Sequence, residues 1–179
     1  MKRLVIGLFA GLLAAVGTGS LPVAASGGSP TIVGIASSTP AFSTLTAAVV
    51  CTGLAPALNG RRHYTVFAPT NAAFAKLGLN ASNVCAALPK ATLTNILLYH
   101  VTPGTRLAKN VLPRRAGQWR TIETLLDDQS FQVNSQGMIR TSSGGSSQIV
   151  TANIRASNGV IHVIDSVLIP GAANENQED

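Results

Sequence analysis

Three histidines are the residues whose side chains could do metal or acid–base chemistry in this chain. They are His63, His100 and His162, and no Asp or Glu stands four residues after any of them. Their spacing matches no local ligand motif of a zinc site. Since a histidine inside an apolar segment is more often a hydrogen-bonded core residue than a ligand, we expect no metal and no cofactor.

A hydrolytic site would need a nucleophile, a base and an acid that can meet. The sequence has no Gly-x-Ser-x-Gly elbow, no phosphate-binding loop and no dinucleotide fingerprint. His162 and Asp165 are three residues apart, so on a strand their side chains point to opposite faces. We therefore expect that the protein is not an enzyme.

Cys51 and Cys85 are the only cysteines. In an exported chain an even number of cysteines favours a disulfide, and the alternative is two separate buried thiols. Two cysteines cannot form a structural zinc site by themselves.

The N-terminus has the pattern of an export signal. Lys2 and Arg3 precede an apolar run over residues 4–16, and small residues stand before a cleavage position near Ala25. We expect residues 1–25 to be a signal peptide that is removed, which places the protein outside the cell or in the periplasm. The alternative is an uncleaved anchor, for which the apolar run is short, since a membrane span needs about 20 residues.

The remaining chain has the length of one domain. We expect a linker over residues 26–30, a single domain over residues 31–170, and a flexible polar tail over residues 171–179. Asn80-Ala81-Ser82 is a glycosylation sequon, which matters only in a eukaryotic host.

Charge is sparse and basic. Lys and Arg number 13 against 7 Asp and Glu, and charged residues are 11% of the sequence, which gives no sign of a nucleic-acid binder. Arg61, Arg62 and His63 are adjacent, either as a solvated loop or as a candidate binding site for an acidic polysaccharide. A looser basic group follows at Arg106, Lys109, Arg114, Arg115 and Arg120.

The segment over residues 156–170 is the one around which the others must pack. Asn158-Gly159 is a strong turn signal, and the residues after it alternate with both faces mostly apolar, as in a strand buried on both sides. Pro170 ends the segment because it has no N–H to donate. Histidine and aspartate in such a strand require hydrogen-bond partners. We expect Tyr99, His100, His162 and Asp165 to be polar residues of the core that fix the register of this strand.

Two earlier segments supply its neighbours. A strand over residues 63–68 stops at Pro69, and Thr70 can cap a helix over residues 71–77 that carries Phe74. A helix over residues 91–98 runs into a Tyr-His-Val strand. Ser82 can cap a turn that carries Cys85. Residues 105–112 suggest a loop or short strand, and further strands are expected at residues 119–122, 131–134, 138–141 and 148–154. Helices first and strands after predict an α+β domain.

These three segments, in this order, closely resemble the fasciclin-type domain. The resemblance covers roughly residues 30–170 and implies a wedge of two β-sheets with several N-terminal helices packed at one side. Asn71 stands where an aspartate is common in the family. The motif residues are Thr65, Phe67, Ala68, Pro69, Thr70, Asn71, Phe74, Tyr99, His100, Asn158, Gly159, His162, Asp165 and Pro170.

The resemblance implies a secreted, non-enzymatic adhesion or matrix-interaction module. Its partner would be a cell-surface or matrix protein or glycan, or a second copy of the chain, with no nucleic acid and no membrane span in the mature protein. The resemblance does not imply integrin binding for this chain. Residues 90–97 match a segment that contacts integrins through an aspartate in animal relatives, and here they contain no aspartate. The alternative is a periplasmic or cell-wall binding protein for an anionic polysaccharide or small ligand. It would use Arg61, Arg62 and His63, or a pocket beside Tyr99 and His100.

Overall fold

The computed structural model describes residues 29–171. The expected signal peptide, most of the linker and nearly all of the tail lie outside these residues. The helices are α1 Ile32–Ser38, the 3₁₀ helix η1 Pro40–Phe42, α2 Ser43–Thr52, α3 Ala55–Leu58, α4 Asn71–Ala75, α5 Val84–Ala87, α6 Lys90–Tyr99 and α7 Ala108–Val111. The strands are β1 Tyr64–Pro69, β2 Val101–Pro103, β3 Trp119–Glu123, β4 Ser130–Asn134, β5 Met138–Thr141, β6 Ser146–Ala156 and β7 Gly159–Ile164.

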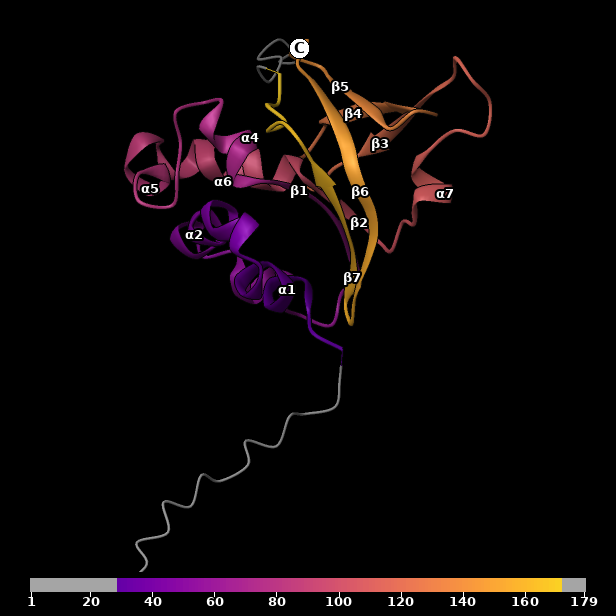
Figure 1. Cartoon of the computed structure of the whole chain (residues 1–179). Helices are drawn as coiled ribbons and strands as arrows, with labels where there is room; N and C mark the ends of the chain where they lie inside the picture. Colours follow the sequence, from indigo (N-terminus) through magenta and orange to yellow (C-terminus); the bar gives the residue numbers. More distant parts are fainter. Residues whose placement is uncertain (1–28, 172–179) are drawn as a thin grey trace, which may run out of the picture.

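The strands form one sheet of seven in the order β2-β1-β7-β6-β5-β4-β3. β1 and β7 pair in parallel, and every other neighbouring pair is antiparallel. β6 is 11 residues long, and it joins the half of the sheet next to the helices to the half that curls away from them (Figure 1). The α+β prediction is confirmed, and the two expected sheets are the two halves of this continuous sheet.

The sheet is curled so far that its two edges approach each other. The Leu125 amide, just after β3, donates a hydrogen bond of 2.7 Å to the Val101 carbonyl of β2. The register of β6 against β7 shifts between Ile149 and Thr151 and again between Thr151 and Ile154. Such irregularities bend a strand and increase its twist, which lets β6 serve both halves.

Two hydrophobic clusters lie on the two faces of the central strands. One packs the helices against the sheet, and Phe42, Leu45, Phe74 and Leu93 belong to it. The other fills the inside of the curl, with residues such as Phe67 and Phe131. Every residue of β1 and β7 is buried, as the doubly apolar pattern of the last strand predicts.

Several element predictions were wrong in detail. Tyr99 is the last residue of α6 and His100 its C-cap, so the expected Tyr-His-Val strand begins only at Val101. The helix continues because His100 bonds back to the Ile96 carbonyl, one turn earlier. Asn83, not Ser82, is the N-cap residue of α5.

The segment after β2 also differs from the expectation. It forms the short helix α7 in place of a loop or strand. The Asn153 side chain of β6 accepts a hydrogen bond of 2.7 Å from the Ala108 amide at the start of this helix. A contact across 45 residues therefore stabilises α7, and no local pattern could indicate it.

Between residues 29 and 171, no single helix has the length and apolar composition needed to cross a membrane. Only α1 together with the η1–α2 segment meets that test, and this pair is bent by 104°.

Candidate functional site

The Asn158–Gly159 turn is built into the structure from three directions. The Asn158 side chain accepts a hydrogen bond of 2.9 Å from the Ile32 amide and donates one of 2.7 Å to the Leu58 carbonyl. A Cβ atom on Gly159 would lie 1.9 Å from the Tyr64 carbonyl oxygen, so only glycine allows β1 and β7 to approach here. Both residues therefore position elements of the fold.

His162 is fully buried at the centre of β7, with 0% of its surface exposed. Its Nε2 donates to the Arg106 carbonyl at 2.9 Å, and its Nδ1 accepts from the Asn153 amide at 3.4 Å. Burial lowers the pKa of His162, against the smaller opposing effect of the Arg106 hydrogen bond. Both ring nitrogens are occupied within the domain, and the imidazole is neutral near pH 7.

His100 joins α6 to the segment after β7. Its Nδ1 donates to the Ile96 carbonyl at 2.7 Å, and its Nε2 accepts from the Leu168 amide at 2.9 Å. Burial lowers the pKa of His100 to about 4, although the bond to Ile96 opposes this shift. His100 is thus a neutral bridge inside the core.

The first motif is also used internally. The Thr65 hydroxyl donates to the Gly104 carbonyl at 2.8 Å and accepts from the Arg106 amide at 2.7 Å. Thr70 caps α4 by accepting from the Ala73 amide at 3.3 Å, as its position before the helix predicts.

Asn71 connects α4 to the beginning of α2. Its Nδ2 donates to the Pro40 carbonyl at 2.9 Å and to the Ser43 hydroxyl at 3.0 Å, while its Oδ1 accepts from the Thr44 amide at 3.0 Å. An aspartate could accept from Thr44 but could not donate to Pro40. The asparagine therefore fits this site where the family often carries a carboxylate.

Tyr99 and Asp165 were expected to be polar residues of the core. Tyr99 is fully buried, and its hydroxyl donates to the Ser130 carbonyl at 2.8 Å. Asp165 lies just beyond β7 and is partly exposed, so its expected place in the core is wrong. Its carboxylate instead accepts from the Gln148 amide at 2.9 Å and the Ser147 hydroxyl at 3.1 Å.

The pKa of Asp165 follows from this environment. Desolvation alone would raise the pKa, but the hydrogen bonds from Gln148 and Ser147, helped by the nearby charge of Lys76, lower it. The ionised carboxylate thus fixes the start of β6 beside the end of β7.

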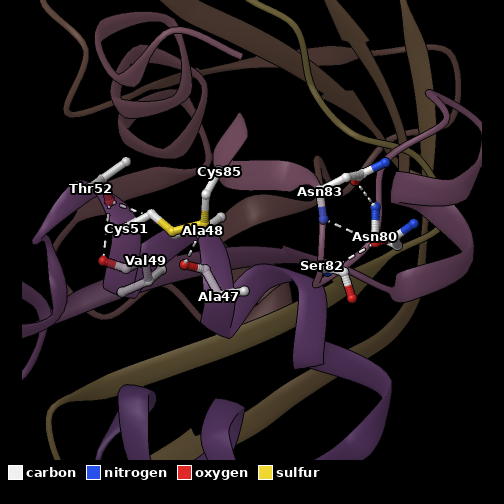
Figure 2. The surroundings of a disulfide bond; sticks show 9 residues. All are labelled: Ala47, Ala48, Val49, Cys51, Thr52, Asn80, Ser82, Asn83 and Cys85. Carbon is white, nitrogen blue, oxygen red and sulfur yellow. Dashed lines mark hydrogen bonds between the residues drawn. A yellow bond between two sulfur atoms is a disulfide. The ribbon is translucent and has the colours of Figure 1, made fainter. Parts of the chain in front are cut away.

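The disulfide joins Cys51 of α2 to Cys85 of α5, with their Cα atoms 6.0 Å apart (Figure 2). In the same view the exposed Asn80 lies in the turn before α5. Its Oδ1 accepts from the amides of Ser82 at 2.9 Å and Asn83 at 3.1 Å. Among residues 29–171, no group of three or more His, Cys, Asp and Glu side chains could hold a metal ion.

The basic loop at residues 61–63 is exposed directly before β1. The Gly104 amide donates to the His63 carbonyl at 2.9 Å, and the Arg106 amide donates to Thr65, two residues further along. The fold therefore brings Arg106 of the second basic group to the first. Arg114, Arg115 and Arg120 lie instead before and within β3.

Beside His100 lies a small apolar cavity of about 40 Å³, lined also by residues of α1 and α2. A cavity needs about 10–15 Å³ of free volume to hold each water molecule. This cavity could hold a few methyl groups at most, so it offers little room for the small ligand considered beside Tyr99 and His100.

One pair of surface residues was missed by the sequence analysis. The guanidinium of Arg140 on β5 stacks 4.4 Å from the ring centre of Trp119 on β3. In both strands exposed and buried residues alternate, and this pattern could have placed both side chains on one outer face.

The model of the fasciclin domain family matches residues 40–170. This chain belongs to the fasciclin domain family.

Two of the fasciclin relatives are bacterial proteins of similar size. Protein sll1483 of Synechocystis is 38% identical over 152 residues, which cover 82% of this chain and 77% of the relative. Immunogenic protein MPB70 of Mycobacterium bovis is 35% identical over 142 residues, covering 76% of this chain and 67% of the relative.

Animal relatives are much longer. Human periostin is 31% identical over 131 residues, which are 72% of this chain but 15% of periostin. Among solved structures, the FAS1 domain pair from the insect cell adhesion molecule fasciclin I superposes with a TM-score of 0.66. It is 21% identical, and the match covers 78% of this chain and 51% of that one. This likeness shows the fasciclin fold.

Proposed function

We propose that this protein is a secreted, non-enzymatic adhesion or matrix-interaction module with one fasciclin domain over residues 31–170. The observation that carries the proposal is the internal use of the motif residues. The polar side-chain atoms of Asn158, His100 and His162 form hydrogen bonds that join segments of the domain. What the domain can offer a partner is therefore its surface, as in a binding module.

Membership of the fasciclin family supports the adhesive role, because the superposed structure comes from an insect cell adhesion molecule. The disulfide supports a place outside the cytoplasm, since such bonds persist in oxidising compartments. His100 and His162, which are buried with both ring nitrogens hydrogen-bonded inside the domain, support the absence of acid–base catalysis by these two residues, since a ring nitrogen must be able to reach a substrate.

The proposal is tested with coated beads. Beads carry the chain over residues 26–179 or, as a control, an unrelated secreted domain of similar charge, and aggregation is scored in low and high salt. Clumping of the coated beads alone, insensitive to salt, would support homophilic adhesion. Adherence to cells or matrix without self-clumping would support a heterologous partner. Absence of both would contradict the proposal.

A second candidate is binding of an anionic polysaccharide at the loop of Arg61, Arg62 and His63. The observation that favours it is the exposed position of this loop and its proximity to Arg106. Like charges that face solvent together attract a polyanion, with an affinity that falls as salt rises.

This candidate has a matched control within the chain. We expect the double variant Arg61→Gln/Arg62→Gln to elute from immobilised polygalacturonate at lower salt than the natural protein. Arg114→Gln/Arg115→Gln removes the same charge from another exposed loop. Equal elution of the two double variants would contradict a specific site at residues 61–63.

A further inference from the structure

β3, β4 and β5 present one side to the core and the other to solvent. Their inward residues are fully buried: Ile122, Phe131, Val133 and Ile139. In Figure 1 these strands lie on the side of the molecule away from α1, α2 and α5. The residues that alternate with the buried ones define the outer β3–β5 face: Trp119, Thr121, Glu123, Gln132, Met138 and Arg140.

An aromatic ring and a guanidinium are stacked on this face. Trp119 is 36% exposed, and the Arg140 guanidinium lies 4.4 Å from its ring centre. Arg140 also donates from Nε to the Gln132 side chain at 2.8 Å, and Gln132 donates to the Thr121 hydroxyl at 3.4 Å. Stacking and hydrogen bonding together hold the guanidinium in one plane before any ligand arrives.

The donors at the end of Arg140 remain available. Among the residues that the structure describes, Arg140 donates only through Nε. Its two terminal nitrogens can therefore donate to a ligand, and the fixed plane of the guanidinium favours paired hydrogen bonds to neighbouring oxygens.

Two polar hollows adjoin each other on this side. One has a volume of about 300 Å³ and is lined by Gln132, Arg140, Thr141 and Ser142, among others. The other has a volume of about 420 Å³ and is lined mainly by polar and acidic side chains. Ser130 lines both hollows, so they are neighbours, and Arg140 of the Trp119–Arg140 stack lines one of them.

The charges that line the two hollows select against a charged polymer. Arg140 stands in one hollow, whereas Glu123, Asp127 and Asp128 line the other. A polyanion lying along both would meet three carboxylates, and a polycation would meet the guanidinium. Amide, hydroxyl, carboxylate and guanidinium groups instead suit an uncharged ligand whose many hydroxyls both donate and accept hydrogen bonds.

A folded protein is a poorer match for the same surface. The centre of a protein interface is usually an apolar patch from which charged residues are depleted. On the outer β3–β5 face the large apolar side chains are Trp119 and Met138, and charged or amide groups surround them. The part of the indole that Arg140 leaves exposed can pack against the apolar C–H side of a sugar ring while the polar groups bind its hydroxyls.

We propose that the outer β3–β5 face binds a chain of a neutral polysaccharide, with a sugar packed on the Trp119–Arg140 stack and its neighbours in the two hollows. This inference deepens the proposed function, on which it rests, by naming the class of partner and the surface that contacts it.

The test uses the single tryptophan of the chain as its reporter. The chain over residues 26–179 is titrated with laminarin, xylan, glucomannan and amylose, with polygalacturonate as the charged comparison, and indole fluorescence and retardation in polysaccharide-containing gels are recorded. We expect at least one neutral polymer to shift the emission of Trp119 and retard the protein. A response to polygalacturonate alone, or to no polymer, would overturn the proposal.

Variants separate this face from the rest of the surface. We expect Trp119→Ala to weaken retardation about tenfold, as for the loss of an anchoring side chain. Arg140→Lys keeps the charge but loses the planar stack, and we expect a similar loss. Val50→Ala removes an apolar side chain that is 66% exposed on α2 and should bind as the natural protein does. Thermal melting of each variant verifies folding, and equal binding by Trp119→Ala would overturn the proposal.

The bead assay repeated with Trp119→Ala distinguishes failure of the polysaccharide-binding face from failure of the adhesive function. If adhesion persists while no neutral polysaccharide binds, the inference fails and the proposed function stands. If a neutral polysaccharide binds Trp119 while no adhesion occurs, the adhesive function fails and the binding face stands. Loss of adhesion in the variant without any polysaccharide binding would assign the face to a protein partner and overturn the inference.

Discussion

At the scale of single residues, the buried polar side chains act as ties between distant segments. His162 binds the Arg106 carbonyl across 56 residues, and His100 binds the Leu168 amide across 68. A buried polar group that loses its partner still carries the cost of its desolvation. Removing one partner therefore destabilises the protein by more than the net free energy that the hydrogen bond contributes.

His162→Ala should lower the free energy of unfolding by about 2–4 kcal/mol, because it leaves a cavity and unpairs the Arg106 carbonyl. Urea denaturation at pH 7 measures this change. His63→Ala, which alters an exposed histidine, should leave the midpoint unchanged. A urea denaturation curve of His162→Ala equal to that of the natural protein would contradict the structural role.

Stability should fall as pH drops from about 6.5 toward 4. Burial lowers the pKa of His100 from 6.5 to about 4, so in this window the unfolded state binds a proton that the folded state does not. The pKa of His162 shifts in the same direction. Above pH 6.5 the contribution of these residues is complete; below about 4 the contribution of His100 is lost, at a cost of up to about 3 kcal/mol.

Urea denaturation at several pH values checks the sign. His100→Gln cannot titrate, so the slope of stability against pH between 4 and 6.5 should become shallower in this variant. An unchanged slope in His100→Gln would show that other groups control the acid transition.

The sequence indicated which polar residues are buried and hydrogen-bonded, but it did not indicate their hydrogen-bond partners. Tyr99, His100 and His162 are buried and hydrogen-bonded because each stands among apolar residues that are themselves buried. Asp165 is different, since it follows the last residue of β7, where alternation no longer determines which side is buried. Trp119 and Arg140 were missed because they meet across strands, a contact that depends on register.

At the scale of elements, α2 is held at both ends. Asn71 binds the backbone at its N-terminal end, and the Cys51–Cys85 bond ties its last turn to α5. Neither tie comes from the intrinsic helix propensity of α2, which contains several β-branched residues.

Loss of the disulfide should destabilise the domain substantially. In the chain-entropy model a closed loop of this length contributes about 3–4 kcal/mol. We expect Cys51→Ser/Cys85→Ser to shift the urea midpoint downward, and the reduced natural protein to match the double variant. A midpoint that neither change moves would contradict a stabilising role for the bond.

Asn71→Asp should lower the free energy of unfolding by about 1–2 kcal/mol, because the carboxylate cannot donate to the Pro40 carbonyl that the amide contacts. Thermal melting checks this, with Asn59→Asp as an exposed control of the same chemistry. A melting temperature equal to that of the control would show that the domain tolerates either residue at position 71.

Elements defined by local patterns were predictable, and elements defined by distant contacts were not. The Asn158-Gly159 turn, the burial of β7 and the hairpin of β4 and β5 follow from short sequence signals. The helix α7 depends on its hydrogen bond to Asn153, and the two register shifts of β6 depend on its pairing with β7. The sequence of either segment carries no mark of these contacts.

At the scale of the whole molecule, the parallel pair β1–β7 lies between the two hydrophobic clusters. Both strands are buried along their whole length, whereas β3 lies at one edge of the sheet and alternates between exposed and buried residues. Local opening is cheapest where few apolar contacts must be broken.

Amide hydrogen exchange should follow this arrangement. We expect the slowest amides in β1 and β7, and faster exchange in β3, which is hydrogen-bonded to β4 alone among the strands of the sheet. Mass spectrometry of peptic fragments can compare the strands directly. Exchange as slow in β3 as in β7 would show that the curled half opens only with the whole domain.

The chain enters and leaves the described domain at opposite ends of its longest strand. The Pro30 carbonyl accepts from the Ser157 amide at the turn after β6, and the Gly171 amide donates to Ser142 at the turn before it. Ile32 is tied to Asn158, the residue before β7, so tension between the two ends would run lengthwise along β7. The hydrogen bonds of β7 to both neighbours would then be loaded in shear and share the force, whereas in peeling they would break one after another. For the adhesive role proposed above, such a geometry would confer mechanical resistance in the direction of the pull.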